Sequence, residues 1–160
     1  MATFINHYSA PIVGLALGVA AGIILLTRKP RWNDYLAFAV ILAGLLAAWI
    51  ILHPRQTPLM EDARQVRAMI GAGTPVLLEF QSPYCLACTA MKPVVDELET
   101  ELGSRLRIIR VNIQETAGRE LAPVYRFAFT PTFIFFDAQG NELWREIGSL
   151  DAGRVRESLK

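Results

Sequence analysis

Two uninterrupted apolar runs stand in the first third of the chain. They cover residues 10–27 (APIVGLALGVAAGIILLT) and 35–52 (YLAFAVILAGLLAAWIIL), and each is 18 residues long. An α-helix of this length rises about 27 Å, close to the roughly 30 Å hydrocarbon core of a membrane. The polar connector 28–34 (RKPRWND) is short enough to be a tight hairpin. The pattern predicts a membrane anchor over residues 1–54, formed by a two-helix transmembrane hairpin.

Other interpretations of these runs are disfavoured. A cleaved signal peptide needs a basic leader, and no charged residue precedes Arg28. A helical pair inside a soluble core would have to be covered by the remaining 106 residues, which are too few for two helices that are apolar all round. Basic residues in the connector predict that it lies in the cytoplasm. We therefore expect a two-pass protein of the inner (cytoplasmic) membrane, with its second domain on the extracytoplasmic, periplasmic side.

Three glycines repeat every fourth residue in the first run, at Gly14, Gly18 and Gly22. Residues at this spacing share one face of a helix, and small side chains there let two helices approach closely. The repeat is either a packing face for the second helix or a partner, or a result of the ordinary abundance of glycine in spanning helices.

Beyond residue 54 the hydrophobic period changes repeatedly. Spacings of three and four alternate with short apolar runs of strand length. The predicted helices are 59–70, 85–102, 119–127 and 152–159, and the predicted strands are 76–80, 107–113, 132–136 and 142–147. Strands that alternate with helices favour parallel pairing, and the last two strands form an antiparallel hairpin. The prediction for residues 55–160 is an α/β domain with a mixed four-stranded sheet and helices on both faces.

The charges separate the two parts of the chain. Residues 1–54 contain four charged side chains, whereas residues 55–160 contain 27, with a balance of −1. This balance excludes the strongly basic surface typical of nucleic-acid binding. We therefore expect no nucleic-acid partner.

The chain has two cysteines, Cys85 and Cys88, directly after a predicted strand and at the start of a predicted helix. Structural zinc needs two more ligands, and the only histidines, His7 and His53, lie in the predicted anchor. A c-type haem site needs histidine at position 89, which is Thr89, and a cysteine hydrolase needs a histidine in the second domain. A pair of inert buried thiols and a redox-active pair both remain open.

The redox interpretation has a physical basis. A thiol at a helix N-terminus faces unpaired N–H groups and the positive end of the helix dipole, which lower its pKa. Cys85 would be the exposed attacking nucleophile, and Cys88, one turn further, would be the resolving cysteine. The two sulfurs could then form a redox-active disulfide, with no other cofactor and no metal.

Around the cysteines the chain resembles the thioredoxin family over about residues 59–160. Five landmarks occur in the family's order: Glu79, Pro93, Arg110 with Asn112, the segment Thr130-Pro131-Thr132, and Gly148. The resemblance implies a thioredoxin-like fold and a thiol:disulfide oxidoreductase. Anchored members of such families deliver reductant outside the cytoplasm, so we expect a membrane-anchored reductase of extracytoplasmic protein disulfides.

The resemblance also implies roles for individual residues. Glu79 would accept and donate the proton of Cys88, although a simple ion pair with Arg110 is an alternative. Pro131 would be a cis-proline facing the sulfurs, rather than a trans proline at the start of a strand. Thr130, Tyr84 and Leu86 would contact the substrate.

Some residues depart from the family pattern. Tyr84 replaces the usual tryptophan, and Leu86-Ala87 replaces Gly-Pro between the cysteines. With no polar side chain between the cysteines to stabilise the thiolate, a reducing or intermediate site is favoured over a strongly oxidising one.

Three functions stay open at this point. The first is the reductase, which acts on protein thiols and disulfides and draws electrons from a membrane donor. The second is an oxidase or isomerase with the same site. The third is a non-enzymatic subunit of a membrane complex, with the domain as a scaffold.

Overall fold

The computed structural model describes residues 9–27, 31–52 and 62–160. The described residues divide into two compact units, one formed by residues 10–27 and 31–52 and the other by Ser9 and residues 62–160. Several predicted features fall outside the described residues: the first part of the hairpin connector (28–30), the linker (54–58), and the start of the helix predicted at 59–70.

The smaller unit contains two helices, α2 (Ser9–Thr27) and α3 (Trp32–Leu52). Both predicted helices are therefore present. Across residues 9–27, 31–52 and 62–160, however, no helix has both the length and the apolar character that crossing a membrane requires. The predicted two-pass localisation in the inner membrane is wrong, and the membrane electron donor loses its basis with it. An apolar run of 18 residues lies at the short end of the spanning range, where length is weak support for a span.

The glycine repeat forms no tight packing face in this structure. A Cβ atom added at Gly14, Gly18 or Gly22 would meet no heavy atom within 4 Å among the described residues. The packing of this glycine face against a partner stays a prediction.

The larger unit alternates helices and strands, as predicted. Its elements are α4 (Ala63–Met69), β1 (Val76–Gln81), α5 (Leu86–Leu102), the 3-10 turn η1 (Gly103–Arg105), β2 (Arg107–Asn112), α6 (Thr116–Val124), β3 (Thr132–Phe136), β4 (Glu142–Ile147) and α7 (Ala152–Glu157).

The four strands form one mixed sheet in the order β2-β1-β3-β4. β1 and β2 are parallel, and β3 and β4 form the predicted antiparallel hairpin. β3 also runs antiparallel to β1, where the alternation of elements favoured parallel pairing. The helix between β2 and β3 explains the difference: α6 has nine residues and rises about 14 Å, less than the roughly 20 Å of a six-residue strand. The chain therefore re-enters the sheet from the end at which it left.

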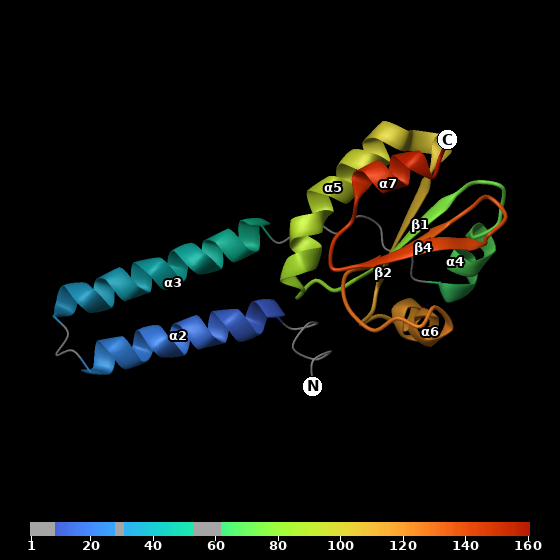
Figure 1. Ribbon diagram of the computed structural model, residues 1–160. Helices are drawn as coiled ribbons and strands as arrows, with labels where there is room; N and C mark the ends of the chain where they lie inside the picture. The colour runs from blue at the N-terminus through green and yellow to red at the C-terminus, as the bar shows by residue number, and fades with distance from the viewer. Residues whose placement is uncertain (1–8, 28–30, 53–61) are drawn as a thin grey trace. The chain divides into compact units, whose positions relative to one another are not determined.

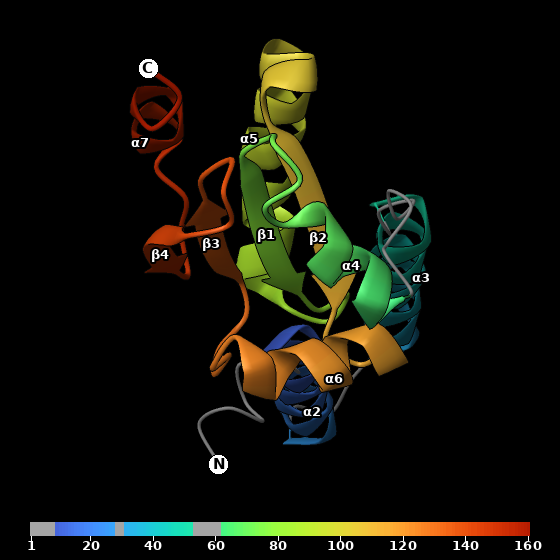
Figure 2. The same cartoon turned by 90° about the vertical axis from the view of Figure 1, so that its right-hand side faces the viewer.

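Helices cover both faces of this sheet (Figures 1 and 2). On one face α4 and α6 bury Val66 and Leu121 against Leu78, Phe80 and other even-numbered residues of β1. On the other face α5 and α7 bury Leu98 and Val155 against Leu77 of β1 and against Phe133 and Phe135 of β3. Side chains alternate between the faces of a strand, so the odd-numbered Glu79 of β1 points toward α5.

The limits of α6 differ most from the prediction, which placed this helix at 119–127. The apolar spacing included Phe127, but this side chain belongs to the turn after the helix, where its ring lies 5.1 Å from that of Phe80. At the other end, Gly118 fits so closely against the end of β2 that an added Cβ would lie 2.0 Å from the carbonyl oxygen of Asn112.

Candidate active site

The two cysteines lie at the junction between β1 and α5. After β1 the chain turns at Ser82, whose carbonyl accepts the backbone N–H of Cys85 at 3.2 Å. Cys85 is the N-cap of α5, with an extended backbone (φ −95°, ψ 116°), and Cys88 lies in the first turn. The cap position directs the Cys85 side chain over the helix end, where its Sγ accepts the backbone N–H of Cys88 at 3.2 Å. Both cysteines are free thiols.

This environment favours the thiolate of Cys85. A hydrogen bond from the Cys88 thiol has the largest effect, and further hydrogen bonds from Thr130 and from the backbone N–H groups of Cys88 and Ala87 add to it. Together they outweigh burial and lower the pKa of Cys85 from 9.0 to about 6. The sequence indicated the helix contribution but not the contributions of Cys88 and Thr130, which come from the fold.

Cys88 has the opposite tendency. Its hydrogen bond to Cys85 has the largest effect, followed by burial, and both raise the pKa of the Cys88 thiol. The charges of Cys85 and Glu79 act in the same direction. Above about pH 6 these shifts favour a thiolate on Cys85 and a proton on Cys88.

The exposure of Cys85 differs from the prediction. Only 1% of its surface is exposed, and Cys88 is 4% exposed, whereas the attacking sulfur was expected to be accessible. The neighbouring side chains of Tyr84 and Leu86 are 36% and 49% exposed. An incoming disulfide thus meets these two side chains more readily than the sulfur itself.

The segment before β3 reaches the cysteines, as predicted. When Cys85 is protonated, its thiol donates to the carbonyl of Thr130 at 3.6 Å. The Thr130–Pro131 peptide bond is cis, as expected. Since β1 and β3 are antiparallel, the last residues of β1 and the first residues of β3 lie at the same end of the sheet. This arrangement brings the segment beside the cysteines.

Glu79 is buried beside the cysteines, with 2% of its surface exposed. Burial raises the pKa of its carboxyl from 4.5 to about 7, against the opposing charge of Arg110. Arg110 lies opposite Glu79 in the pairing of β1 with β2, and its Nε is 3.3 Å from Glu79 Oε2. The two interpretations of Glu79, proton carrier and ion-pair partner, are therefore compatible.

Sequence reasoning missed the acidic residues of α5 that also bind Arg110. One Nη of Arg110 lies 2.8 Å from Asp96 Oδ1 and 3.1 Å from Glu99 Oε2. The signal was present in the spacing, because Asp96 and Glu99 are three residues apart and share one face of the helix. Asp96 and Glu99 are linked to Glu79 only through Arg110, which lies opposite Glu79 in the register of β1 with β2. The sequence alone does not predict this register.

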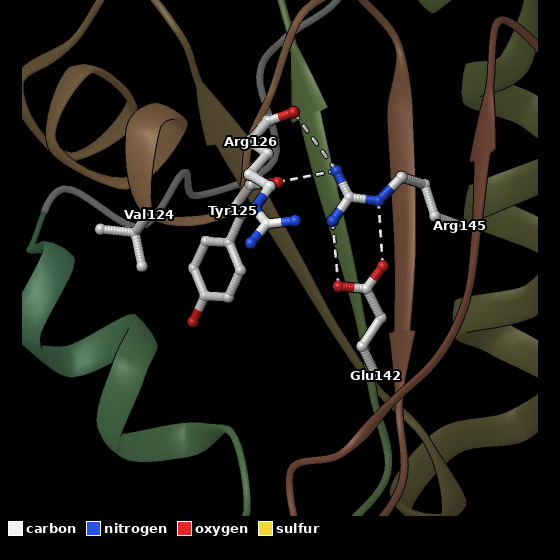
Figure 3. A pocket seen from close by; sticks show the side chains of 5 residues that line it. All are labelled: Val124, Tyr125, Arg126, Glu142 and Arg145. Atoms are coloured by element: carbon white, nitrogen blue, oxygen red, sulfur yellow. Dashed lines mark hydrogen bonds and ion pairs between the residues drawn. The ribbon is translucent and has the colours of Figure 1, made fainter.

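A separate pocket of about 630 Å³ contains none of the predicted site residues. It is lined by Val124, Tyr125, Arg126, Glu142 and Arg145. Arg145 makes a two-point ion pair with Glu142 and donates to the carbonyl of Tyr125 at 2.7 Å (Figure 3). These contacts tie the start of β4 to the segment that follows α6, which indicates a structural role for Arg145.

Comparisons with known proteins agree with this fold and site. Residues 60–160 match the family model for thioredoxin. The chain is 30% identical to the chloroplastic M-type thioredoxin of Pisum sativum over 161 residues, covering 95% of this chain and 89% of that protein. It is 29% identical to the thioredoxin of Pyropia yezoensis over 61% of this chain and 89% of that one.

Solved structures show the same fold. The thioredoxin of Fasciola hepatica superimposes with a TM-score of 0.55 at 23% identity, covering 64% of this chain and 96% of that one. The family model and the Pisum sativum relative show family membership in addition to the fold. The chain therefore belongs to the thioredoxin family and is a thiol:disulfide oxidoreductase that acts on protein disulfides and needs no cofactor beyond its cysteine pair.

Proposed function

We propose that this protein reduces disulfides of protein substrates, with Cys85 as the nucleophile and Cys88 as the resolving cysteine. The observation that carries the proposal is the arrangement of the pair: the Cys85 sulfur caps α5 and accepts the N–H of Cys88, and Cys88 keeps its proton. The Cys85 sulfur can thus attack first, as a thiolate, and the protonated Cys88 sulfur reacts in the second exchange.

The reaction takes two exchanges. The Cys85 thiolate attacks one sulfur of the substrate disulfide, which forms a mixed disulfide and releases the other substrate sulfur as a thiolate that takes a proton from water. Cys88 then loses its proton and attacks Cys85, which forms the Cys85–Cys88 disulfide and releases the second substrate thiol. The substrate gains two electrons and two protons, and an external dithiol reductant must restore the pair.

Glu79 is the proposed acceptor of the Cys88 proton. Its pKa of about 7 lets the carboxylate take up a proton near neutral pH and return it to solvent later. The negative charge of Glu79 is also one of the influences that raise the pKa of Cys88, which supports an electrostatic connection between the two groups.

Substrate contacts are proposed for Tyr84, Leu86 and the Thr130–Pro131 segment. Tyr84 and Leu86 are partly exposed on either side of Cys85, and Thr130 contacts the Cys85 sulfur through its carbonyl. An apolar substrate segment could cover the first two side chains as its disulfide reaches the sulfur.

One observation favours the second function, an oxidase or isomerase. A Cys85 pKa of about 6 stabilises the reduced form and makes the disulfide more oxidising than a pair with an ordinary thiol. That pKa is still well above the roughly 3.5 of the strongest known oxidant of this type, which favours the reductase. The reduction potential of the pair separates the two functions: a value near −270 mV supports the reductase, and one near −120 mV the oxidase.

The test of activity is the reduction of insulin disulfides by the full-length protein, with dithiothreitol as the electron source. We expect the protein to accelerate reduction and Cys85→Ala to abolish the acceleration. In a separate reaction without dithiothreitol, which would cleave the intermediate, pre-reduced Cys88→Ser should accumulate a mixed disulfide with insulin. Equal rates for the protein and for Cys85→Ala would refute the proposal.

A further inference from the structure

The guanidinium of Arg110 is shared among three carboxylates. Its Nε lies 3.3 Å from Glu79, while one Nη lies closer to Asp96 (2.8 Å) and Glu99 (3.1 Å). Arg110 and Glu79 are buried, with side-chain exposures of 5% and 2%, whereas Asp96 and Glu99 are 42% and 48% exposed. The buried acid thus competes with two surface acids for one buried cation.

We infer that Asp96 and Glu99 are positioning residues for Glu79: they hold the Arg110 guanidinium toward α5 and limit how strongly its charge favours the Glu79 carboxylate. This inference deepens the proposed function and rests on the role of Glu79 as the proton acceptor for Cys88. It gives a reason why a buried acid beside an arginine can still bind a proton near neutral pH.

The other charged and titratable groups around Glu79 fit this inference. From α5, Lys92 favours the carboxylate and Asp96 opposes it, and Lys92 Nζ is itself held by Asp96 Oδ2 at 2.6 Å. Cys85 opposes the charge of Glu79, and the charge of Glu79 raises the pKa of the Cys88 thiol. From β3 the residue opposite Glu79 is the apolar Phe133. The acidic residues of α5 therefore bind both basic groups that face Glu79, Arg110 and Lys92.

The direct experiment is a pH titration of the Glu79 side-chain carboxyl by ¹³C NMR in the full-length reduced protein. In the variant Asp96→Asn/Glu99→Gln, Arg110 would be free to engage Glu79 fully, so we expect the Glu79 midpoint to fall by about one pH unit. Glu97→Gln/Glu101→Gln is the matched control, because it also removes two negative charges, from exposed positions of α5. An unchanged midpoint in the double variant would overturn the inference.

Two further measurements separate an effect through Arg110 from direct repulsion between acids. Rotation of the Arg110 guanidinium, measured by ¹⁵N NMR, should be slow in the unmodified protein and faster in the double variant; equal rotation in both would contradict the inference. In an Arg110→Lys background, which lacks the forked geometry, the same two substitutions should shift the Glu79 midpoint less. An equal shift in that background would also contradict it.

The proposed function can fail separately. If Glu79→Gln leaves the rate of substrate release by Cys88 unchanged, Glu79 is not the proton acceptor, and the proposed role fails. The NMR midpoints would still decide whether Asp96 and Glu99 act on Glu79 through Arg110.

Discussion

The Sγ atom of Cys85 accepts the backbone N–H of Cys88 at a distance of 3.2 Å. This contact exists because Cys85 occupies the N-cap of α5, where an ordinary helix would place the oxygen of Ser, Thr or Asp. The reactive sulfur therefore also stabilises the helix end, and its thiolate form accepts this hydrogen bond more strongly than the thiol form does.

Alkylation of the reduced protein should show this preference. Only the thiolate reacts, so the rate of Cys85 modification by iodoacetamide should rise with pH and reach half its maximum near pH 6. Cys88→Ala removes the most important hydrogen bond, and we expect the midpoint to rise by about one unit or more. Mass spectrometry after pulses at several pH values measures both. A midpoint at the ordinary value of roughly 8.5 in the unmodified protein would contradict the prediction.

The raised pKa of Glu79 predicts how stability depends on pH. The pKa of Glu79 is about 7 in the folded state and 4.5 ordinarily, so between these pH values the folded state binds more protons than the unfolded state. The contribution of Glu79 to stability is therefore fully present below about pH 4.5 and is lost as the pH rises through 7. Glu79→Gln should therefore gain stability relative to the unmodified protein between pH 5 and pH 8, by up to about 3 kcal/mol. Urea unfolding at both pH values measures this difference. If the difference in the free energy of unfolding between the two proteins does not grow with pH, burial does not destabilise the Glu79 carboxylate, and the prediction is wrong.

Gly118 gives a prediction about packing. An added Cβ would lie 2.0 Å from the backbone carbonyl oxygen of Asn112, and backbone atoms at a strand end cannot move aside cheaply. Gly118→Ala should destabilise the protein by about 3 kcal/mol, although alanine is the better helix former. Ala122→Ser, one turn further along α6, is the control and should cost less than about 1 kcal/mol. Equal midpoints of thermal unfolding for the two variants would argue against the close fit.

The start of α7 depends on Asp151. Its carboxylate accepts the backbone N–H groups of Gly153 at 2.8 Å and Arg154 at 3.3 Å. Asp151→Ala should cost about 1 kcal/mol, and Asp151→Asn, which keeps an acceptor oxygen, should cost less. Chemical denaturation of the two variants compares them directly. Equal losses would show that the charge, rather than the hydrogen bonds, is what matters at this position.

Periodicity predicted most of the fold because its signals are local. The strands 132–136 and 142–147 were predicted with the limits that the structure shows, since each is a short run between turn residues. The direction of β3 relative to β1 was not predictable in the same way. It depends on how far α6 carries the chain, and the alternation of elements, which favoured parallel pairing, does not contain this distance.

The candidate site shows the same division. Spacing and family resemblance identified four site residues, and the fold brings them together at one end of the central strands. These residues are Cys85, Cys88, Glu79 and Pro131. Whether a sulfur is exposed depends on the surrounding surface, which has no sequence period, so the burial of Cys85 was missed. The localisation failed for a different reason: the length and apolar character of two runs and the basic connector between them predicted membrane spans, but no helix within residues 9–27, 31–52 and 62–160 has the length and apolar character that a span requires.

The antiparallel pairing of β1 with β3 has a mechanical consequence for catalysis. β1 and β3 are the two central strands, and Phe80 pairs with Thr132 at the end of the sheet that faces the cysteines. The loop that carries Cys85 leaves β1 there, and the loop that carries Thr130 enters β3 there. Central strands open rarely, because opening them approaches global unfolding. The movement that admits a substrate disulfide to the buried sulfur must then come from side chains or from the loop tips, while the spacing between the two loops is held constant by the sheet.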